Sequence, residues 1–334
     1  MISNAPFESK QAYRFSVAPM LDCTDRHFRV MMRQISQKAL LYTEMVVAQA
    51  LHHSKQRNQL LDFYSIEHPI SLQIGGDNPT LLAEAARMGE DWGYDEINFN
   101  VGCPSPRVTS GNFGACLMAT PDQVARCIEA MTKASNLPVT IKHRIGIDNL
   151  DSDELLVEFV DKIANAGAKR FAIHARKAWL EGLSPKENRT IPPLEHEKVA
   201  RLKLKRPNLK IELNGNLQSP KDCLNALQLF DGAMVGRAVY EHPMRWTTID
   251  EIIFGEGSKE IKASTIIKQL IPHTENHLRN NGRLWDIAKH FLNLVEEIPG
   301  ARSWRRNLGE KAHKKNAELK VIEDAAKQLE DAGF

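Results

Sequence analysis

The segment EINFNVGCPSPRV, residues 96–108, contains in one place the pattern that decides the fold. Apolar residues alternate with polar ones, as in a strand, and a turn with glycine, cysteine and proline follows. Similar apolar or β-branched runs recur through the first 240 residues. They begin near Phe15, Leu41, Ile70, Val139, Arg170, Lys210 and Gly232.

The spacing of these eight runs predicts parallel strands. Successive starts lie 22 to 43 residues apart, which leaves room for the helix that joins two parallel strands. Eight strand–helix units over about 250 residues predict a (β/α)8 TIM barrel. A doubly wound open sheet is the alternative, which we consider weaker because the polar residues of chemical interest all follow strands.

Capping residues predict where several helices begin. A capping side chain precedes a proline at three places, which are Asn78-Pro79, Thr120-Pro121 and Ser219-Pro220. Ser152 is predicted to cap a further helix that Gly167 closes. One face of that helix is expected to carry Leu155, Leu156, Phe159 and Ile163.

Strand signals stop after Tyr240. Helical patterns follow at 261–270, 285–297 and 317–329, with a break at Ile298-Pro299-Gly300. We therefore predict a barrel domain at 1–250 and a helical domain at 251–334.

Composition indicates an ordinary cytoplasmic protein. Of the 334 residues, 42% are hydrophobic and 26% are charged, and no stretch approaches the ~20 apolar residues of a membrane helix. The first residues do not resemble a secretory signal. Five scattered cysteines without a CxxC pair suit a reducing compartment, and we expect no metal site. Nothing indicates an obligate protein partner.

Charge is unevenly distributed although the net charge is only +2. Residues 176–210 contain 10 Lys and Arg against 4 Glu, and residues 301–320 contain 7 against 2. Such runs are more often solvated surface. Two separate basic segments also fit a polyanion as partner.

The ends of the predicted strands carry an unusual set of polar and cationic residues. In a barrel these positions face the active site. They are Pro19, Met20, Glu44, Gln73, Asn98, Asn100, Lys142, Arg144, His174, Arg176, Asn214, Gly236 and Arg237. The turns NGN at 214–216 and VGR at 235–237 suit an anion, since phosphate sites recur after strands seven and eight of such barrels.

Cys103 stands out among the cysteines because a Gly-Cys-Pro turn places it directly after the fourth strand. A lone cysteine is usually an inert core residue, and we interpret Cys116, Cys127 and Cys223 in that way. Cys23 has no evident role. The position of Cys103 favours a reactive thiol.

The roles of two other strand-end residues stay open. Lys142 suits an electrostatic partner of an anionic cofactor or a Schiff-base amine. His174 suits a proton donor, an anion contact or a core histidine. No GxGxxG follows the first strand, which disfavours a Rossmann dinucleotide site.

The ordered motifs resemble those of tRNA-dihydrouridine synthases. They are APMLDCTDRHFR, SLQIGG, INFNVGCPSPRV, VTIKHRIG, FAIHAR, LNGN and MVGR. HARKAWLEGLSPKENRTIPPL and IPGARSWRR resemble the A subfamily. Cys23 stands where the family has Trp, and the phosphate turn has NGN in place of NGG or NGD.

The resemblance implies non-covalent FMN, reduced by NADPH, and reduction of the uridine 5,6 double bond in the tRNA D-loop, at positions 20 and 20a. Cys103 would protonate C5 after hydride reaches C6. FMN would contact Pro19, Met20, Leu21, Gln73, Lys142, His174, Asn214, Gly215, Asn216, Gly236 and Arg237. The tRNA would contact Asn100, Lys186, Arg189, Arg302 and Arg305.

Two other functions compete with this one. A TIM-barrel aldolase or phosphosugar enzyme would use Lys142 as a nucleophile and the NGN and VGR turns for substrate phosphate. A non-catalytic RNA-binding barrel would need no positioned acid, so the combination of Cys103, Lys142 and His174 argues against it.

Overall fold

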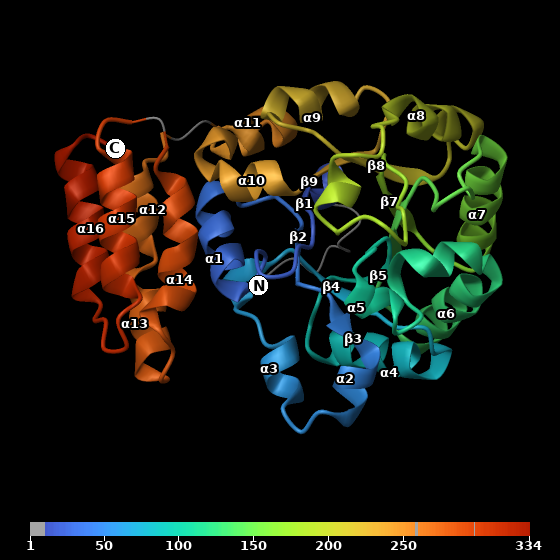
Figure 1. Ribbon diagram of the computed structural model, residues 1–334, viewed down its shortest axis with the longest axis horizontal. Helices are drawn as coiled ribbons and strands as arrows, with labels where there is room; N and C mark the ends of the chain where they lie inside the picture. Colours follow the sequence, from blue (N-terminus) through green and yellow to red (C-terminus); the bar gives the residue numbers. More distant parts are fainter. Residues whose placement is uncertain (1–10, 258–259, 297) are drawn as a thin grey trace.

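The computed structural model describes residues 11–257, 260–296 and 298–334. A barrel of parallel strands surrounded by helices forms one body, and a bundle of C-terminal helices lies beside it (Figure 1). The strands are β1 Phe15–Val17, β2 Leu41–Tyr42, β3 Val46–Val47, β4 Ile70–Gly75, β5 Glu96–Val101, β6 Val139–Arg144, β7 Arg170–His174, β8 Lys210–Asn214 and β9 Gly232–Val235. All eight predicted strand starts are confirmed, and β3 is a short addition that pairs with the end of β4.

The strands pair in the order β1-β9-β8-β7-β6-β5-β4-β2, and every pair is parallel. A bridge between Ser16 and Leu40 brings β1 back to the β2 end of this order. There the Val17 amide donates to the Leu40 carbonyl at 3.0 Å. The predicted (β/α)8 barrel is therefore the observed fold, and the open-sheet alternative is wrong.

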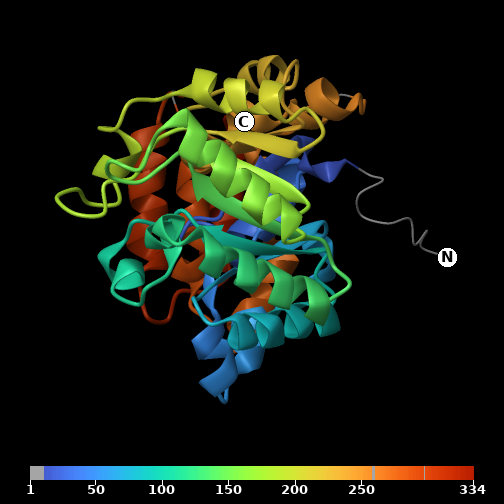
Figure 2. The ribbon, with the colours of Figure 1, turned by 90° about the vertical axis from the view of Figure 1, so that its right-hand side faces the viewer.

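Helices cover the outside of the strands, as Figure 2 shows for α6 and α7 in green. The barrel helices are α1 Arg26–Ile35, α2 Ala48–His53, α3 Arg57–Leu61, α4 Pro79–Asp91, α5 Pro106–Thr109, α6 Pro121–Ala134, α7 Asp153–Asn165, α8 His196–Lys205, α9 Pro220–Ala226, α10 Arg237–Glu241 and α11 Ile249–Phe254. The last of these runs through the proposed boundary at residue 250 and packs against α9. The division into domains stays a prediction.

Three of the four predicted caps are confirmed. The side chains of Asn78, Ser152 and Ser219 accept hydrogen bonds from the first turns of α4, α7 and α9. Thr120 precedes α6 but its hydroxyl donates to the Leu117 carbonyl instead, so that cap was wrongly predicted. Leu155 was also wrongly placed, because it is 41% exposed on α7.

The C-terminal helices are shorter and more numerous than the sequence predicts. They are α12 Ala263–Gln269, α13 Ile271–Arg279, α14 Leu284–Phe291, α15 Ala301–Ala312 and α16 Lys320–Asp331. No sequence pattern predicted α13 or α15. The helix predicted from 285 to 297 ends at Phe291 and continues as a 3-10 turn, Leu292–Leu294, and position 297 lies outside the described residues.

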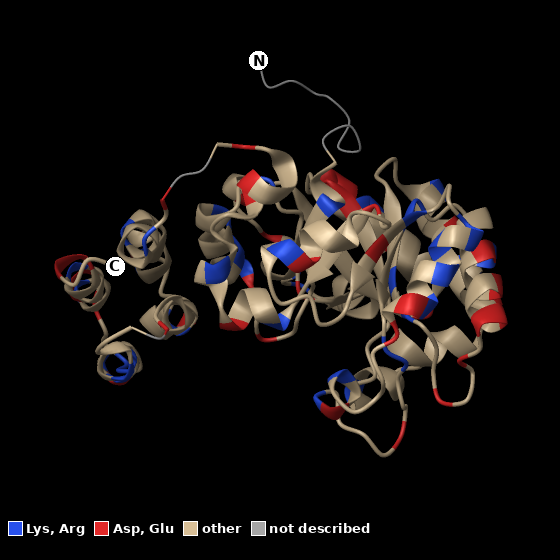
Figure 3. Ribbon diagram, turned by 90° about the horizontal axis from the view of Figure 1, so that it is seen from above, with Lys and Arg blue, Asp and Glu red and all other residues tan. Residues whose placement is uncertain are grey.

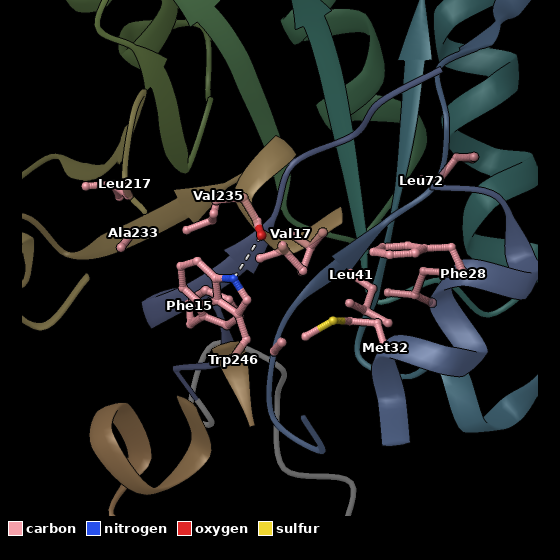
Figure 4. Close-up of a cluster of buried hydrophobic side chains, with 14 of the residues drawn as sticks. Phe15, Val17, Phe28, Met32, Leu41, Leu72, Leu217, Ala233, Val235 and Trp246 are labelled. Carbon is pink, nitrogen blue, oxygen red and sulfur yellow. Dashed lines mark hydrogen bonds between the residues drawn. The ribbon is translucent and has the colours of Figure 1, made fainter. Parts of the chain in front are cut away.

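The apolar packing of the barrel joins its first and last strands. Phe15 of β1 stacks on Trp246 with ring centroids 5.4 Å apart (Figure 4). The Trp246 indole nitrogen donates to the Ala238 carbonyl at 3.1 Å, so this large buried ring leaves no polar atom unsatisfied. Val17 and Val235 lie beside it in the same cluster.

The inside of the barrel also holds a buried charged group. Arg170 of β7 forms ion pairs with Glu96 of β5 and Glu212 of β8, and all three side chains are at most 5% exposed. Ser16 donates to Glu212 at 2.6 Å, and Ser71 and Thr140 donate to Glu96 at 2.9 and 2.8 Å. The charges are thus paired and hydrogen-bonded, as buried charges must be.

A histidine cluster joins the barrel to the C-terminal bundle. Asp25 caps α1 and accepts a hydrogen bond from His290 of α14 at 2.9 Å. The His27 ring of α1 lies 2.9 Å from the His273 ring of α13, and it meets the His277 ring edge-on.

None of the helices in the described part of the chain has the length and apolar character that a membrane crossing requires.

Acid should weaken this junction. Burial lowers the pKa of His27 from 6.5 to about 3, Asp25 opposes the shift, and His277 and His273 add to it. Between these pH values the unfolded chain binds the proton more readily, so the contribution to stability is complete above pH 6.5 and is lost toward pH 3.

We therefore predict that His27→Gln loses less stability than the wild type between pH 7 and pH 4. Each pKa unit corresponds to about 1.4 kcal/mol, so the difference should be on the order of a few kcal/mol. Chemical denaturation at a series of pH values measures it, with His53→Gln as an exposed control. Identical pH slopes for His27→Gln and the wild type would contradict the assignment.

Candidate active site

The residues singled out at strand ends meet at one mouth of the barrel. The Lys142 ammonium of β6 donates to the Asn214 side-chain oxygen of β8 at 3.2 Å. A Cβ on Gly236 would lie 3.3 Å from the Met20 sulfur, so the turns after β1 and β9 are in contact. Parallel strands of a barrel all end at the same face, which explains why residues far apart in sequence meet there.

The turn after β8 requires glycine. Gly215 has φ +128°, and a Cβ there would lie 3.1 Å from Leu194 and 3.2 Å from the His174 ring. Its neighbour Asn216 also has a positive φ, +54°. The NGN turn therefore passes close to His174, and the Gly215 carbonyl accepts a hydrogen bond from the His196 ring at 2.7 Å.

Four cations gather at the mouth. Lys142 is half-buried, and burial lowers its pKa to about 8, with Arg144 adding to the shift and Cys103 opposing it. Burial lowers the pKa of both Arg176 and Arg189, and Arg237 adds to the shift of each, so Arg237 is close enough to affect both groups. Within the described residues, no carboxylate forms an ion pair with Lys142, Arg176, Arg189 or Arg237. Such a site attracts an anion.

Burial, and then the surrounding positive charge, favour the neutral form of His174. Burial lowers its pKa well below the ordinary value, and Arg144, Lys142, Arg176 and Arg189 lower it further. A neutral imidazole can donate and accept one hydrogen bond each but adds no charge to the site. Of the roles that the sequence left open for His174, the environment favours a contact to a ligand.

A chain of amides supports the turn that carries Cys103. The Asn100 oxygen accepts from the amides of Gly102 and Cys103 at 3.2 and 3.1 Å, and its nitrogen donates to Gln73 at 2.8 Å. Gln73 in turn donates to Asn98 at 2.8 Å. The side chains of Gln73 and Asn100 thus bond to each other and to neighbouring groups of the barrel. The contact predicted between Gln73 and the cofactor and the contact predicted between Asn100 and RNA stay predictions.

The far side of the Cys103 turn also has a fixed backbone. The Ala115 amide donates to the Cys103 carbonyl at 2.9 Å. Gly114 has φ +77°, and a Cβ there would lie only 2.6 Å from that carbonyl. Cys103 is half-exposed at the mouth and also packs against the barrel core, and its assignment as a reactive cysteine stays a prediction.

The other cysteines differ in part from the prediction. Cys127 and Cys223 are buried, as expected, but Cys116 is half-exposed and bonds to the Phe113 carbonyl, so its interpretation as core is wrong. Cys23 lies on the turn after β1. Burial raises its pKa, with Asp22 and Glu44 adding to the effect.

Sequence reasoning gave no role to several residues that shape the mouth. Glu44 accepts from the Asp22 amide at 2.6 Å, where the backbone has φ +64°, and so fixes the turn that follows Met20 and Leu21. Asn188 is fully buried and holds the loop after β7 together. Glu44 was visible as a polar strand-end residue, but Asn188 had no signal.

The predicted RNA contacts fall in two places. Lys186 and Arg189 are exposed on the loop after β7, whereas Arg302 and Arg305 are exposed on α15 of the C-terminal bundle. Basic residues occur on both bodies when the molecule is seen from above (Figure 3). The structure brings Arg189 to the mouth but leaves the two arginines of α15 on the second body.

Two hollows of the described structure lie away from the mouth. One of about 390 Å³ lies between the end of the barrel and the C-terminal helices, beside His242 and Phe334. Another of about 790 Å³ lies on the outside between α6 and α7. No predicted site residue lines either hollow. The candidate site is therefore identified by the chemistry of its side chains and not by a cavity.

Comparison with known proteins agrees with the sequence motifs. The profile of the family described as dihydrouridine synthase (Dus) matches residues 16–330. A tRNA-dihydrouridine(20/20a) synthase of Synechocystis sp. is 55% identical over 295 residues, which is 88% of each chain. The enzyme of the same name from Shewanella oneidensis is 46% identical over 99% of this chain and 98% of its own.

Among solved structures, a 2-naphthoyl-CoA reductase bound to 2-naphthoyl-CoA is similar in fold. The TM-score is 0.56 at 11% sequence identity, covering 73% of this chain. The chain spans half the length of that structure, so the likeness concerns the barrel fold alone.

Proposed function

The chain belongs to the dihydrouridine synthase family, and we propose that it uses FMN and NADPH to reduce uridine in the tRNA D-loop, at positions 20 and 20a. Membership of this family supports the conversion of tRNA uridine to dihydrouridine. The single observation that supports the finer proposal is Cys103 at a mouth lined by unpaired cations. An aldolase using Lys142 is disfavoured, because the family match accounts for the lysine without a Schiff base.

The residues present fit FMN. Lys142, Arg176 and Arg237 offer positive charge to a phosphate or an anionic ring, and glycine turns at 215 and 236 let backbone amides approach it. Leu21 is 50% exposed at the same mouth, an apolar surface that suits a flat aromatic ring. We assign FMN binding to Pro19, Met20, Leu21, Gln73, Lys142, His174, Asn214, Gly215, Asn216, Gly236 and Arg237.

FMN reduced by NADPH would supply the hydride that C6 of the uracil receives. Negative charge then develops on C5 and the C4 oxygen, so C5 needs a proton. Cys103 carries a thiol at the mouth and is the acid that we assign to this step. Lys142 and Arg144 lie near enough for Cys103 to affect the pKa of both, so they would stabilise the thiolate that remains.

The target base must leave its stack to reach this mouth. Lys186 and Arg189 on the barrel and Arg302 and Arg305 on α15 would hold the tRNA from two sides. The exposed positions of all four agree with contacts to phosphate, which set orientation rather than sequence.

We predict that the purified protein is yellow and releases FMN on denaturation. Because the pKa of Lys142 is about 8, an anion bound beside it should bind less tightly as pH rises from 7 to 9. The loss should reach at most about tenfold per pH unit. Fluorescence titration of apoprotein with FMN measures it: Lys142→Met should flatten the pH dependence, and the exposed control Lys169→Met should keep it. A colourless protein that does not bind added FMN would rule out the cofactor assignment.

Replacing Cys103 by Ala should separate the two half-reactions. NADPH should still reduce the bound flavin, but reoxidation by tRNA should slow by about 100- to 10,000-fold, the usual worth of a general acid. Stopped-flow absorbance follows both steps, and Cys116→Ala, a half-exposed thiol on the neighbouring turn, serves as control. Wild-type reoxidation by Cys103→Ala would exclude it as the proton donor.

Loss of a phosphate contact should change the salt dependence of tRNA binding. Each of Lys186→Ala, Arg189→Ala, Arg302→Ala and Arg305→Ala should reduce the slope of log K against log salt by about 0.7 to 0.9. Flavin reduction by NADPH should be unchanged, because no RNA takes part. Lys133→Ala on the outer helix α6 is the control. If all four slopes equal that of the control, these residues are ordinary surface charges.

A further inference from the structure

Arg144, the last residue of β6, joins two loops at the barrel mouth. Its Nε donates to the Gly102 carbonyl at 2.9 Å, and its Nη1 donates to the carbonyls of Lys177 and Asn188 at 3.0 Å each. Gly102 immediately precedes Cys103, and Asn188 immediately precedes Arg189. A single guanidinium, 4% exposed, thus holds both the turn of the thiol and the loop of the basic residues.

Each of the two segments is stiff in itself. Two amides of the Cys103 turn donate to the Asn100 oxygen, and the Cys103 carbonyl accepts from Ala115. In the loop after β7, the Asn188 side chain bonds to both backbone polar groups of Trp179 and to the Leu183 carbonyl. A displacement of the loop is therefore transmitted through Arg144 rather than absorbed within either segment.

The guanidinium also lies in the electrostatic field of both segments. Burial lowers the pKa of Arg144 to about 10, Cys103 opposes the shift, and Arg189 and Arg176 add to it. In the described part of the chain Arg144 forms no ion pair, and the groups that accept its hydrogen bonds are three backbone carbonyls. Its charge is available to the thiol, and its planar fork fixes the geometry in a way that an ammonium cannot reproduce.

We propose that Arg144 is a positioning residue that couples engagement of RNA by the loop after β7 to placement of the Cys103 thiol. This inference rests on the proposed function, in which Cys103 gives its proton to the uracil and Arg189 contacts the tRNA. Misplacement by about 1 Å can lower a rate by about 100-fold, so a small movement of this link is enough to matter.

The test uses the full-length flavoprotein with saturating tRNA in single turnover. Arg144→Lys keeps the charge but cannot span the three carbonyls, so reoxidation of reduced flavin by tRNA should slow by about 10- to 100-fold. Reduction by NADPH and the Kd for tRNA should change little. Arg33→Lys is the matched control, because Arg33 is also buried and also donates to backbone carbonyls, of Ser36, Ala39 and Glu67, away from the mouth. It should lower thermal stability without slowing reoxidation.

A double-mutant cycle then tests the coupling itself. Arg189→Ala should lower the single-turnover rate in the wild-type background, but in the Arg144→Lys background it should affect tRNA affinity only. Additive effects on the rate would overturn the inference. Should Arg144→Lys fail to fold, Asn188→Ala loosens the loop end of the link, and an unchanged rate at saturating tRNA would overturn the inference equally.

The outcome distinguishes this inference from the proposed function. If Arg144→Lys reoxidises at the wild-type rate while Cys103→Ala is inactive, the coupling is wrong and the proton donor stands. If Cys103→Ala itself turns over normally, the proposed function fails.

Discussion

The barrel depends on one buried charged group, Arg170 held between Glu96 and Glu212. With the hydroxyl groups that bond to the two carboxylates, it links residues of β1, β4, β5, β6, β7 and β8 inside the barrel. Removing one partner of a buried ion pair typically costs about 3 to 5 kcal/mol, because a charge is left uncompensated. The strands must therefore pair in one register. A shift of one strand would move its polar side chain away from this group and leave a charge without its partner or its hydrogen bond.

A chain of hydrogen-bonded polar side chains runs from this charged group to the candidate site. Thr140 bonds to Glu96 and accepts from Asn98, and Gln73 and Asn100 continue the chain to the Cys103 turn. Every member uses its hydrogen bonds on its neighbours, which makes the chain rigid. The backbone of the Cys103 turn is thereby held by the polar chain on one side and by Arg144 on the other. Catalytic groups need this kind of support, since small displacements are costly.

Charge divides the molecule into parts with different tasks. Cations without ion-pair partners among the described residues collect at the mouth, where an anion can bind, while the junction with the C-terminal bundle carries histidines around Asp25. Burial opposes ionisation of Asp25, yet hydrogen bonds from His290 and Lys289 hold the pKa of that carboxyl well below its usual range. Because Asp25 also caps α1, which follows the turn of Met20 and Leu21, the bundle is anchored next to the site. That position agrees with the tRNA contacts that we propose for Arg302 and Arg305.

The sequence by itself determined eight of the strands, four of the barrel helices and the set of residues at the mouth. Alternation, caps and glycine turns are local signals, so the starts of eight strands, all but β3, and the caps at Asn78, Ser152 and Ser219 could be predicted, and family motifs added the expected chemistry. Only the tertiary structure decided what depends on residues distant along the chain: the bridge from Ser16 to Leu40, the Arg170 pairs, and the link from Arg144 to Gly102 and Asn188. The failures have the same cause. The Thr120 hydroxyl bonds backwards to the Leu117 carbonyl, Leu155 faces solvent, and α13 and α15 are stabilised by packing against the other helices rather than by a clear pattern of their own. Local periodicity shows which residues can be buried, but which partner each one meets is settled only when the chain closes on itself.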